Sequence, residues 1–290
     1  MVAASLPIVT RFAPSPTGRL HLGHAYSAML AHDLAKAGNG RFLLRIEDID
    51  PGRTRESFVA GIEEDLRWLG LRWDEPPVRQ SARLSLYAAA LDRLKEAGLA
   101  YPCFCTRAEI AASASAPHGM DESIYPGTCR RLSAETRRTR MISEAHCWRL
   151  DVIEARARVG QLVWQDETAG TVSAVPEMHG DVVLARKDAP TSYHLAVTVD
   201  DAAQGVTDVV RGADLFAATD VHRLLQALFG LPVPRYHHHP LLTAPDGSRL
   251  AKRAGSPGIA DYRAAGADPA VLIAALRAGT ALPLPTARPT

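Results

Sequence analysis

The sequence contains no run of apolar residues that approaches the roughly 20 needed to cross a bilayer. Residues 1–7 lack the charged start and the apolar core of a secretory signal. Four cysteines in 290 residues are too few for a disulfide scaffold. We therefore expect a soluble protein in a reducing, cytoplasmic environment.

The chain also lacks an excess of charge of either sign. Its 33 Lys and Arg residues balance 32 Asp and Glu residues, for a net charge of +1. This balance excludes a globally basic nucleic-acid binder, so any contact with RNA must come from local patches. Only four of the basic residues are lysines, at positions 36, 95, 187 and 252. The length allows one large or two modest domains with a proper core.

One stretch, residues 11–24, stands out because it joins a short buried strand to a predicted helix over residues 25–37. The loop between them contains two prolines, two glycines and a His-x-Gly-His pair. Free N–H groups at a helix start favour an anion, and Gly23 allows close approach of the backbone. His21 and His24 are spaced so that both imidazoles can face one phosphate. By itself, a His-x-Gly-His pair is also compatible with chance or with a metal-binding pair.

A second buried strand is predicted over residues 41–46 and is followed directly by Glu47. Strand, helix and strand at this spacing predict a parallel sheet with a right-handed crossover. Ligands of such sheets bind beyond the carboxyl ends of the strands. Residues 11–15 and Glu47 should therefore face one crevice. The alternative for residues 47–55 is a solvated loop with an Asp-Pro turn.

The remaining chain predicts core helices over residues 56–69, 81–97 and 219–229, and short strands between residues 148 and 185. Tyr193 is placed in a strand, where a tyrosine usually serves packing. Gly212 beside Arg211 indicates that a ligand or another part of the chain approaches the backbone closely at this point. The histidines at 237–239 are interpreted as a buried or strand-end run rather than a metal site, because no acidic residue lies nearby in sequence.

Three cysteines and a tyrosine between residues 101 and 129 can be interpreted in two ways, as a four-coordinate zinc site or as reduced structural thiols. Cys147 is expected to be an inert buried thiol. Five arginines come after Cys129, at positions 130, 131, 137, 138 and 140. They predict a solvated helix face, with contact to an RNA backbone as the alternative.

Residues 11–24 resemble the signature of class I aminoacyl-tRNA synthetases in the form seen in glutamyl and glutaminyl enzymes. The resemblance covers about residues 6–255. It implies an α/β fold, a Rossmann-like catalytic domain with a parallel sheet, a small zinc-binding insert and no anticodon-binding domain. The implied divisions are 6–100 and 148–255 for the two catalytic halves, 101–147 for the insert, and 256–290 for a C-terminal helix and tail.

The resemblance also implies roles for individual residues. ATP with Mg²⁺ would be bound by His21, Gly23, His24 and Lys252, of which both histidines and the lysine are catalytic. Lys252 lies in a segment similar to the Lys-Met-Ser-Lys-Ser loop, although Arg249, Ala251 and Arg253 depart from that pattern. The residues implied to hold L-glutamate are Arg11, Phe12, Ala13, Pro14, Ser15, Glu47, Tyr193 and Arg211.

The zinc ligands implied by the short members of the family are Cys103, Cys105, Tyr125 and Cys129. Resemblance to those members further implies transfer of glutamate to the queuosine base of tRNA(Asp), with no obligate protein partner and no membrane. Two alternatives stay open. One is a truncated glutamyl synthetase that charges the tRNA 3′ end, and the other is a non-catalytic paralogue that binds nucleotide or RNA.

Overall fold

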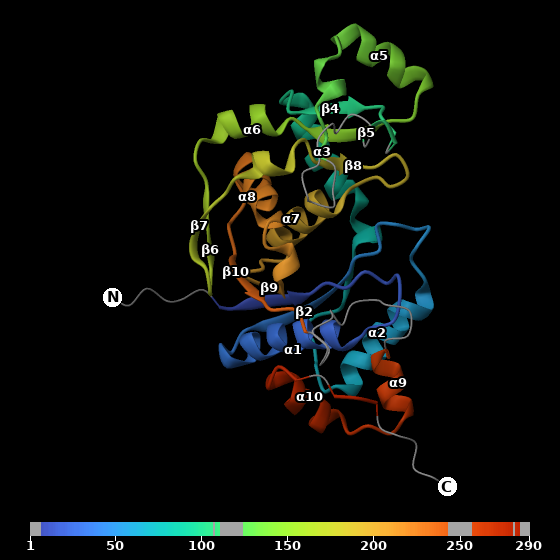
Figure 1. Cartoon of the computed structure of the whole chain (residues 1–290), viewed down its shortest axis with the longest axis vertical. Coiled ribbons are helices and arrows are strands. Elements are labelled where there is room, and N and C mark those ends of the chain that lie inside the picture. Colours follow the sequence, from blue (N-terminus) through green and yellow to red (C-terminus); the bar gives the residue numbers. More distant parts are fainter. Residues whose placement is uncertain (1–6, 107, 111–123, 243–256, 281, 285–290) are drawn as a thin grey trace.

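A computed structural model describes residues 7–106, 108–110, 124–242, 257–280 and 282–284 of the chain (Figure 1). The strands are β1 (Val9–Phe12), β2 (Arg41–Ile46), β3 (Val78–Arg79), β4 (Ala100–Cys103), β5 (Cys147–Leu150), β6 (Val163–Asp166), β7 (Gly170–Ser173), β8 (Val183–Ala185), β9 (Asp208–Gly212) and β10 (Arg235–His239). The α-helices are α1 (Leu22–Ala37), α2 (Glu56–Trp68), α3 (Leu84–Glu96), α5 (Ala134–Ser143), α6 (Val152–Val159), α7 (Tyr193–Ala203), α8 (Ala218–Phe229), α9 (Ile259–Ala264) and α10 (Pro269–Arg277). Four 3₁₀ turns complete the elements, namely η1 (Gln80–Arg83), η2 (Thr128–Arg131), η3 (Pro176–His179) and η4 (Ala213–Leu215).

Two sheets with parallel strands meet in the middle of the molecule. One has the order β1-β2-β3, and the other has the order β7-β6-β10-β9, in which only β7 is antiparallel. β1 runs beside β9, because the Thr207 N–H donates to the Val9 carbonyl over 3.0 Å and the Val9 N–H donates to the Thr207 hydroxyl over 2.8 Å. The predicted α/β fold with a parallel sheet is confirmed, and β1, β2, β9 and β10 end at the same edge.

The first strand–helix–strand unit is built as the sequence predicts. β1 and β2 pair in parallel over four residues, and α1 returns the chain between them. The turn into β2 needs a glycine, because a Cβ at Gly40 would collide with the Ile8 carbonyl oxygen. Helix α1 begins at Leu22, three residues before the predicted start, since His21 and His24 cap it.

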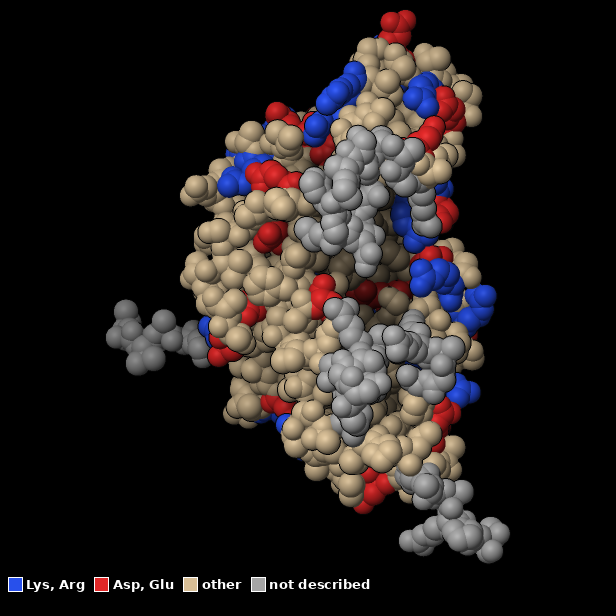
Figure 2. Space-filling model, in the orientation of Figure 1, with Lys and Arg blue, Asp and Glu red and all other residues tan. Residues whose placement is uncertain are grey.

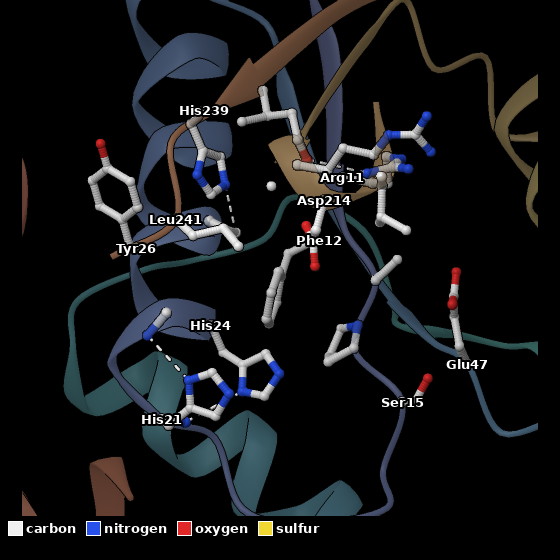
Figure 3. A pocket seen from close by; sticks show the side chains of 18 of the residues that line it. Arg11, Phe12, Ser15, His21, His24, Tyr26, Glu47, Asp214, His239 and Leu241 are labelled. Carbon is white, nitrogen blue, oxygen red and sulfur yellow. Dashed lines mark hydrogen bonds between the residues drawn. The ribbon is translucent and has the colours of Figure 1, made fainter. Parts of the chain in front are cut away.

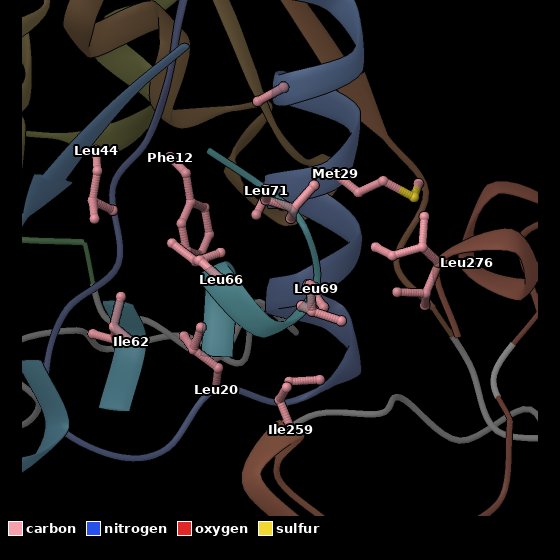
Figure 4. Close-up of a cluster of buried hydrophobic side chains, with 14 of the residues drawn as sticks. Phe12, Leu20, Met29, Leu44, Ile62, Leu66, Leu69, Leu71, Ile259 and Leu276 are labelled. Atoms are coloured by element: carbon pink, nitrogen blue, oxygen red, sulfur yellow. The ribbon is translucent and has the colours of Figure 1, made fainter. Parts of the chain in front are cut away.

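A hydrophobic core joins this unit to the C-terminal helices (Figure 4). Phe12 of β1 and Leu44 of β2 pack with Leu66 of α2 on one side. Met29 of α1 meets Leu276 of α10 in the same cluster. A second cluster holds the other sheet against α3, α6, α7 and α8, with Trp164 buried in it. These cores hold the ends of the central strands in place. Among the described helices, none has the length and apolar character required to pass through a membrane.

The segment around the cysteines forms one end of the molecule (Figure 1). Its antiparallel sheet has the order β4-β5-β8, and η2 and α5 lie next to it. A small cluster that includes Tyr101, Phe104 and Cys147 forms its core. Helix α5 has no buried residue, so it adds little to this core.

Several predicted elements between residues 148 and 201 are wrong. Tyr193 is the first residue of helix α7, because the Ser192 hydroxyl caps the helix by accepting from the Leu195 N–H. The three strands expected between residues 148 and 176 are present as β5, β6 and β7, but helix α6 between β5 and β6 was not expected. Asp151 caps this helix by accepting from the Glu154 N–H over 3.1 Å. The expected strand over 179–185 is only β8, preceded by η3. At α6 and α7 a local cap outweighs the β-branched residues that favour a strand.

Candidate active site

A cavity of about 680 Å³ opens where β1, β2, β9 and β10 end. The predicted residues that line it are Arg11, Phe12, Ala13, Pro14, Ser15, His21, Gly23, His24, Glu47, Tyr193 and Arg211. The structure therefore brings together every described residue that the sequence assigned to glutamate or ATP. Lys252 lies outside the described residues. Figure 2 shows a recess in this region with acidic side chains inside it.

The walls of the cavity differ in chemistry (Figure 3). In this view, Ser15 and Glu47 lie on one side of the Phe12 ring. His21 and His24 lie on the other side, together with His239 of β10. One part of the cavity thus offers charged groups suited to an amino acid, and the other offers imidazoles at a helix start, suited to phosphates.

The two imidazoles at the start of α1 are fixed by the backbone. His21 Nδ1 accepts from the Gly23 N–H over 3.1 Å, and His24 Nδ1 accepts from the His21 N–H over 3.2 Å. The rings stack with centroids 3.8 Å apart. Because each Nδ1 is an acceptor, the neutral rings carry their proton on Nε2. Both Nε2–H groups are therefore hydrogen-bond donors.

Glu47 follows β2 and is held by the opposite loop. Its N–H donates to the Pro14 carbonyl over 3.0 Å, and its carboxylate lies 3.5 Å from the fully buried Arg45. Burial raises the pKa of Glu47, against the charges of Arg45 and Arg11. A cation in the cavity would restore the ionised form, so this carboxylate is suited to a ligand ammonium.

Arg11 is held by a carboxylate from a distant part of the chain. Its Nε and Nη2 donate to the two oxygens of Asp201 on α7, over 3.0 Å and 3.4 Å. Asp201 also accepts from Arg45 over 2.8 Å. Although burial alone would raise it, the charges of Arg11 and Arg45 lower the pKa of Asp201. The Asp201 carboxylate is thus shared by two buried arginines.

Arg211 and Tyr193 form the neighbouring wall. Arg211 lies in β9, is buried, and donates to the Tyr193 hydroxyl over 3.3 Å. Burial raises the pKa of Tyr193, so the phenol stays protonated. The pair presents a guanidinium and a phenol to the cavity, a combination suited to a carboxylate.

The histidine run has acidic partners that sequence reasoning missed. His237 lies 2.7 Å from Asp208 of β9, and His238 lies 2.7 Å from Asp166 of β6. His239 lines the cavity and its Nε2 lies 2.7 Å from the Ser27 hydroxyl. The interpretation as a buried strand-end run is confirmed, since the histidines lie in β10.

The described cysteines of the insert form a cluster that fits a metal. The Sγ atoms of Cys103, Cys105 and Cys129 all lie within 4.8 Å of one another. Cys105 Sγ lies 3.5 Å from Cys129 Sγ and 3.8 Å from the Tyr125 hydroxyl oxygen. Tetrahedral ligands with zinc–sulfur bonds of about 2.3 Å lie about 3.8 Å apart. The three cysteines fit a zinc ion in spacing and in chemistry, and the Tyr125 hydroxyl lies beside them.

The surroundings of this cluster also suit an anionic sulfur site. A hydrogen bond from Cys147 lowers the pKa of Cys103 to about 4, against burial, and raises the pKa of Cys147. The guanidinium of Arg149 stacks 3.9 Å from the centre of the Tyr125 ring. A buried cation next to thiolates compensates their charge.

The arginine run that follows the cluster is mostly engaged within the protein. Arg130 lies 3.1 Å from Asp181. Arg137 and Arg140 stack on the rings of Tyr101 and Phe104. The other two, Arg131 and Arg138, are exposed. The predicted solvated helix face therefore applies to part of the run.

The chain matches the family described as tRNA synthetases class I (E and Q), catalytic domain, over residues 7–281. The chain belongs to this family. It is a ligase of the aminoacyl-tRNA synthetase type. Its catalytic domain has the expected fold of the class, and the match does not extend beyond that domain.

Named relatives and solved structures agree with this assignment. A Glutamyl-Q tRNA(Asp) synthetase from Rhodobacter capsulatus is 50% identical over 272 residues, which is 91% of this chain and 97% of that protein. The protein of the same name from Symbiobacterium thermophilum is 45% identical over 91% of this chain and 83% of its own length.

A glutamate-tRNA synthetase from Elizabethkingia anophelis superposes with a TM-score of 0.73, at 29% identity over 86% of this chain. A glutamate tRNA ligase from Elizabethkingia meningosepticum, solved in complex with its amino acid, gives a TM-score of 0.71, at 27% identity over 89% of this chain. This chain spans 53% of each of these two synthetases.

Half of the residues that line the cavity were not among the predicted ligand-binding residues. The missed residues are Thr17, Tyr26, Ser27, Arg53, Val210, Gly212, Asp214, Leu215, His239, Leu241 and Leu242. A signal existed for Asp214, because it lies in the same Arg-Gly-x-Asp-Leu segment as Arg211. For His239 it did not, since its place in the wall depends on the pairing of β10 with β9. Tyr26 lies on α1, and its ring contacts that of His239.

Proposed function

We propose that the protein activates L-glutamate with ATP and transfers it to the queuosine base of tRNA(Asp). The observation that supports this most strongly is the single cavity that joins Glu47 and Arg211 to the two histidines at the start of α1. The names of relatives with up to 50% identity support the choice of acceptor. We also propose a cytoplasmic location, where tRNA is modified.

In the first step, an oxygen of the glutamate α-carboxylate attacks the α-phosphorus of ATP. The bond from that phosphorus to the bridging oxygen breaks, so glutamyl-adenylate forms and pyrophosphate leaves. In the second step, a nucleophilic group of the queuosine base attacks the acyl carbon, and AMP leaves. Such chemistry requires positioning and charge stabilisation from the protein, with little covalent help.

The glutamate ligands are assigned by charge. Glu47 binds the ammonium group, because its carboxylate is buried in the wall. Arg211 and Tyr193 bind a carboxylate, with Arg11 beside them. Ser15 adds a polar contact, whereas Phe12, Ala13 and Pro14 shape the wall.

The phosphate ligands lie at the start of α1. Nε2–H groups of His21 and His24 donate to phosphate oxygens as charge moves toward the leaving group, and Gly23 lets the backbone come close. Lys252 is proposed to neutralise the departing pyrophosphate. Mg²⁺, when bound with ATP, supplies further neutralisation of the phosphate charge.

Zinc is proposed as a structural ion held by Cys103, Cys105, Tyr125 and Cys129. A closed site of four protein ligands has no open position for a substrate, so its contribution is to folding. We propose that residues 101–147 form this insert between the catalytic halves 6–100 and 148–255, followed by a C-terminal helix and tail over 256–290.

The acceptor is tested with labelled glutamate, ATP and two bulk tRNA pools, one from cells that make queuosine and one from cells that lack it. Label in the queuosine-containing pool alone is the expected result. Equal labelling of both pools would indicate charging of the tRNA 3′ end. No label and no adenylate would indicate a non-catalytic paralogue.

A further inference from the structure

Three buried arginines lie around the amino-acid side of the cavity, and their surroundings are not alike. Arg11 and Arg45 form ion pairs with Asp201, and Arg45 also lies near Asp200 and Glu47. Arg211 has no carboxylate within 4.0 Å among the residues that the structure describes. A buried guanidinium without a counter-charge is costly unless a ligand supplies one.

The partners of Arg211 are all uncharged acceptors. Its Nε donates to His238 Nε2 over 3.1 Å, and its Nη2 donates to the Thr219 hydroxyl over 2.6 Å. Its Nη1 is shared between the Tyr193 hydroxyl and His222 Nδ1, each at 3.3 Å. Four of the five N–H donors are therefore oriented, while the charge of the guanidinium is left unmatched.

Each histidine is held as an acceptor by a partner of its own. His238 Nδ1 donates to Asp166 over 2.7 Å, which leaves Nε2 without a proton. His222 Nε2 lies 3.2 Å from His194 Nδ1. Because an arginine can only donate, His222 Nδ1 is the acceptor, so its proton lies on Nε2 and is donated to His194. Burial, followed by the charge of Arg211, lowers the pKa of both His222 and His238.

Neither His222 nor His238 lines the cavity, so both act through Arg211. We infer that His222, His238 and Thr219 are positioning residues that orient Arg211 without neutralising it, so that its charge is kept for a carboxylate of the amino-acid substrate. Carboxylates at these positions would give the same hydrogen bonds and remove that charge. The inference rests on the proposed function, since it assigns the substrate charge that Arg211 receives.

The experiment compares isosteric variants that differ only in charge, His222→Asn with His222→Asp, and Thr219→Asn with Thr219→Asp. Adenylate formation is measured by ATP–pyrophosphate exchange, and the KM for glutamate and the KM for ATP are determined separately. Thr171→Asn and Thr171→Asp serve as the control for net charge, because Thr171 is exposed on β7 and does not line the cavity.

We expect each Asp variant at 222 or 219 to raise the KM for glutamate on the order of tenfold over its Asn counterpart. This is the effect expected when an opposite charge is added within about 4–6 Å of Arg211. The KM for ATP should be the same within each pair. Each Asp variant should also unfold at a higher denaturant concentration than its Asn counterpart, because Arg211 gains an ion-pair partner. The control pair should show neither difference.

A purely structural role gives a different pattern, since Asn and Asp would then support Arg211 equally and the KM for glutamate would not separate. That result, or Asp variants at both positions that fail to fold, would overturn the inference. Equilibrium dialysis of the wild-type protein with labelled glutamate separates this outcome from failure of the proposed function. A wild type that binds no glutamate would overturn both.

Discussion

The imidazole rings of His21 and His24 stack 3.8 Å apart at the start of α1, and each ring accepts a backbone N–H through its Nδ1. The same two side chains therefore cap the helix and direct Nε2–H donors outward from the ring. Capping and phosphate contact are combined in one pair of residues. Substitutions can separate the two roles.

His24→Asn should lose catalysis while it keeps most of the cap, because an amide oxygen can replace Nδ1 as the acceptor of the His21 N–H. We expect adenylate formation to fall about 10²- to 10³-fold, as for loss of one transition-state donor. His24→Ala should lose as much activity and, in addition, about 1 kcal/mol of unfolding free energy. Pyrophosphate exchange and urea unfolding measure the two effects. An active His24→Asn protein would refute the donor role.

Asp201→Ala should destabilise the fold, because it leaves the buried guanidinium groups of Arg11 and Arg45 without a shared counter-charge. The expected loss is about 3–5 kcal/mol of unfolding free energy. Glu154→Gln, which removes an exposed ion pair with Arg158 on α6, should change stability by less than about 1 kcal/mol. Similar losses of unfolding free energy for the two variants would show that burial of an ion pair does not determine the cost of breaking it.

Chelation of zinc should lower the stability of the insert, and purified protein should contain about one zinc per chain. Cys105→Ala and Cys129→Ala should lose the metal, and Tyr125→Phe should reduce its affinity. Cys147→Ala should keep the metal but bind it less tightly, because Cys147 lies outside the three-cysteine cluster and yet forms a hydrogen bond with the Cys103 thiol. The zinc content of each variant is measured by metal analysis after gel filtration. Loss of zinc from Cys147→Ala alone would require a different ligand set.

Stability should fall between neutral and acidic pH because of buried neutral histidines. Burial lowers the pKa of His194 and of His238 to about 4, from an ordinary value of 6.5. Between these values the unfolded chain binds protons that the folded chain excludes, so the free energy of unfolding decreases as the pH falls from 6.5 toward 4. The upper limit is about 1.4 kcal/mol per pH unit for each histidine.

Urea unfolding of the wild type and of His194→Asn over this pH range isolates the effect from that of other groups. The variant should show a shallower decrease, since asparagine does not titrate. Identical slopes in the two proteins would show that His194 is already protonated in the folded state.

The local parts of the fold and the site were predictable from the sequence. Residues 9–46 show helical and strand periodicities and a Gly/Pro loop, so β1, α1 and β2 follow from short-range patterns. The cap that His21 and His24 form was not predicted, and it places the start of α1 three residues earlier than expected. The predicted glutamate residues at 11–15 and 47 lie at strand ends of this one unit. Their shared cavity follows from the rule that parallel strands end at a common edge.

Long-range partners were not predictable in the same way. Asp201 matches Arg11 from 190 residues away, and Asp166 reaches His238 across 72 residues. Such pairs depend on strand order, which periodicity does not determine. Tyr193 was assigned to a strand because the apolar run that follows it resembles one, whereas the Ser192 cap makes it a helix.

The position of β1 beside β9 has a consequence for folding. Val9 and Thr207, which join the two strands, lie 198 residues apart in the chain. Closing so long a loop reduces the entropy of the chain before the contacts that compensate for it have formed, so the pairing of β1 with β9 is slow. During synthesis the N-terminal unit can form early, but the outer edge of β1 stays unpaired until β9 has been made. The cavity therefore forms late, and until then the exposed edge of β1 can pair with other chains and aggregate.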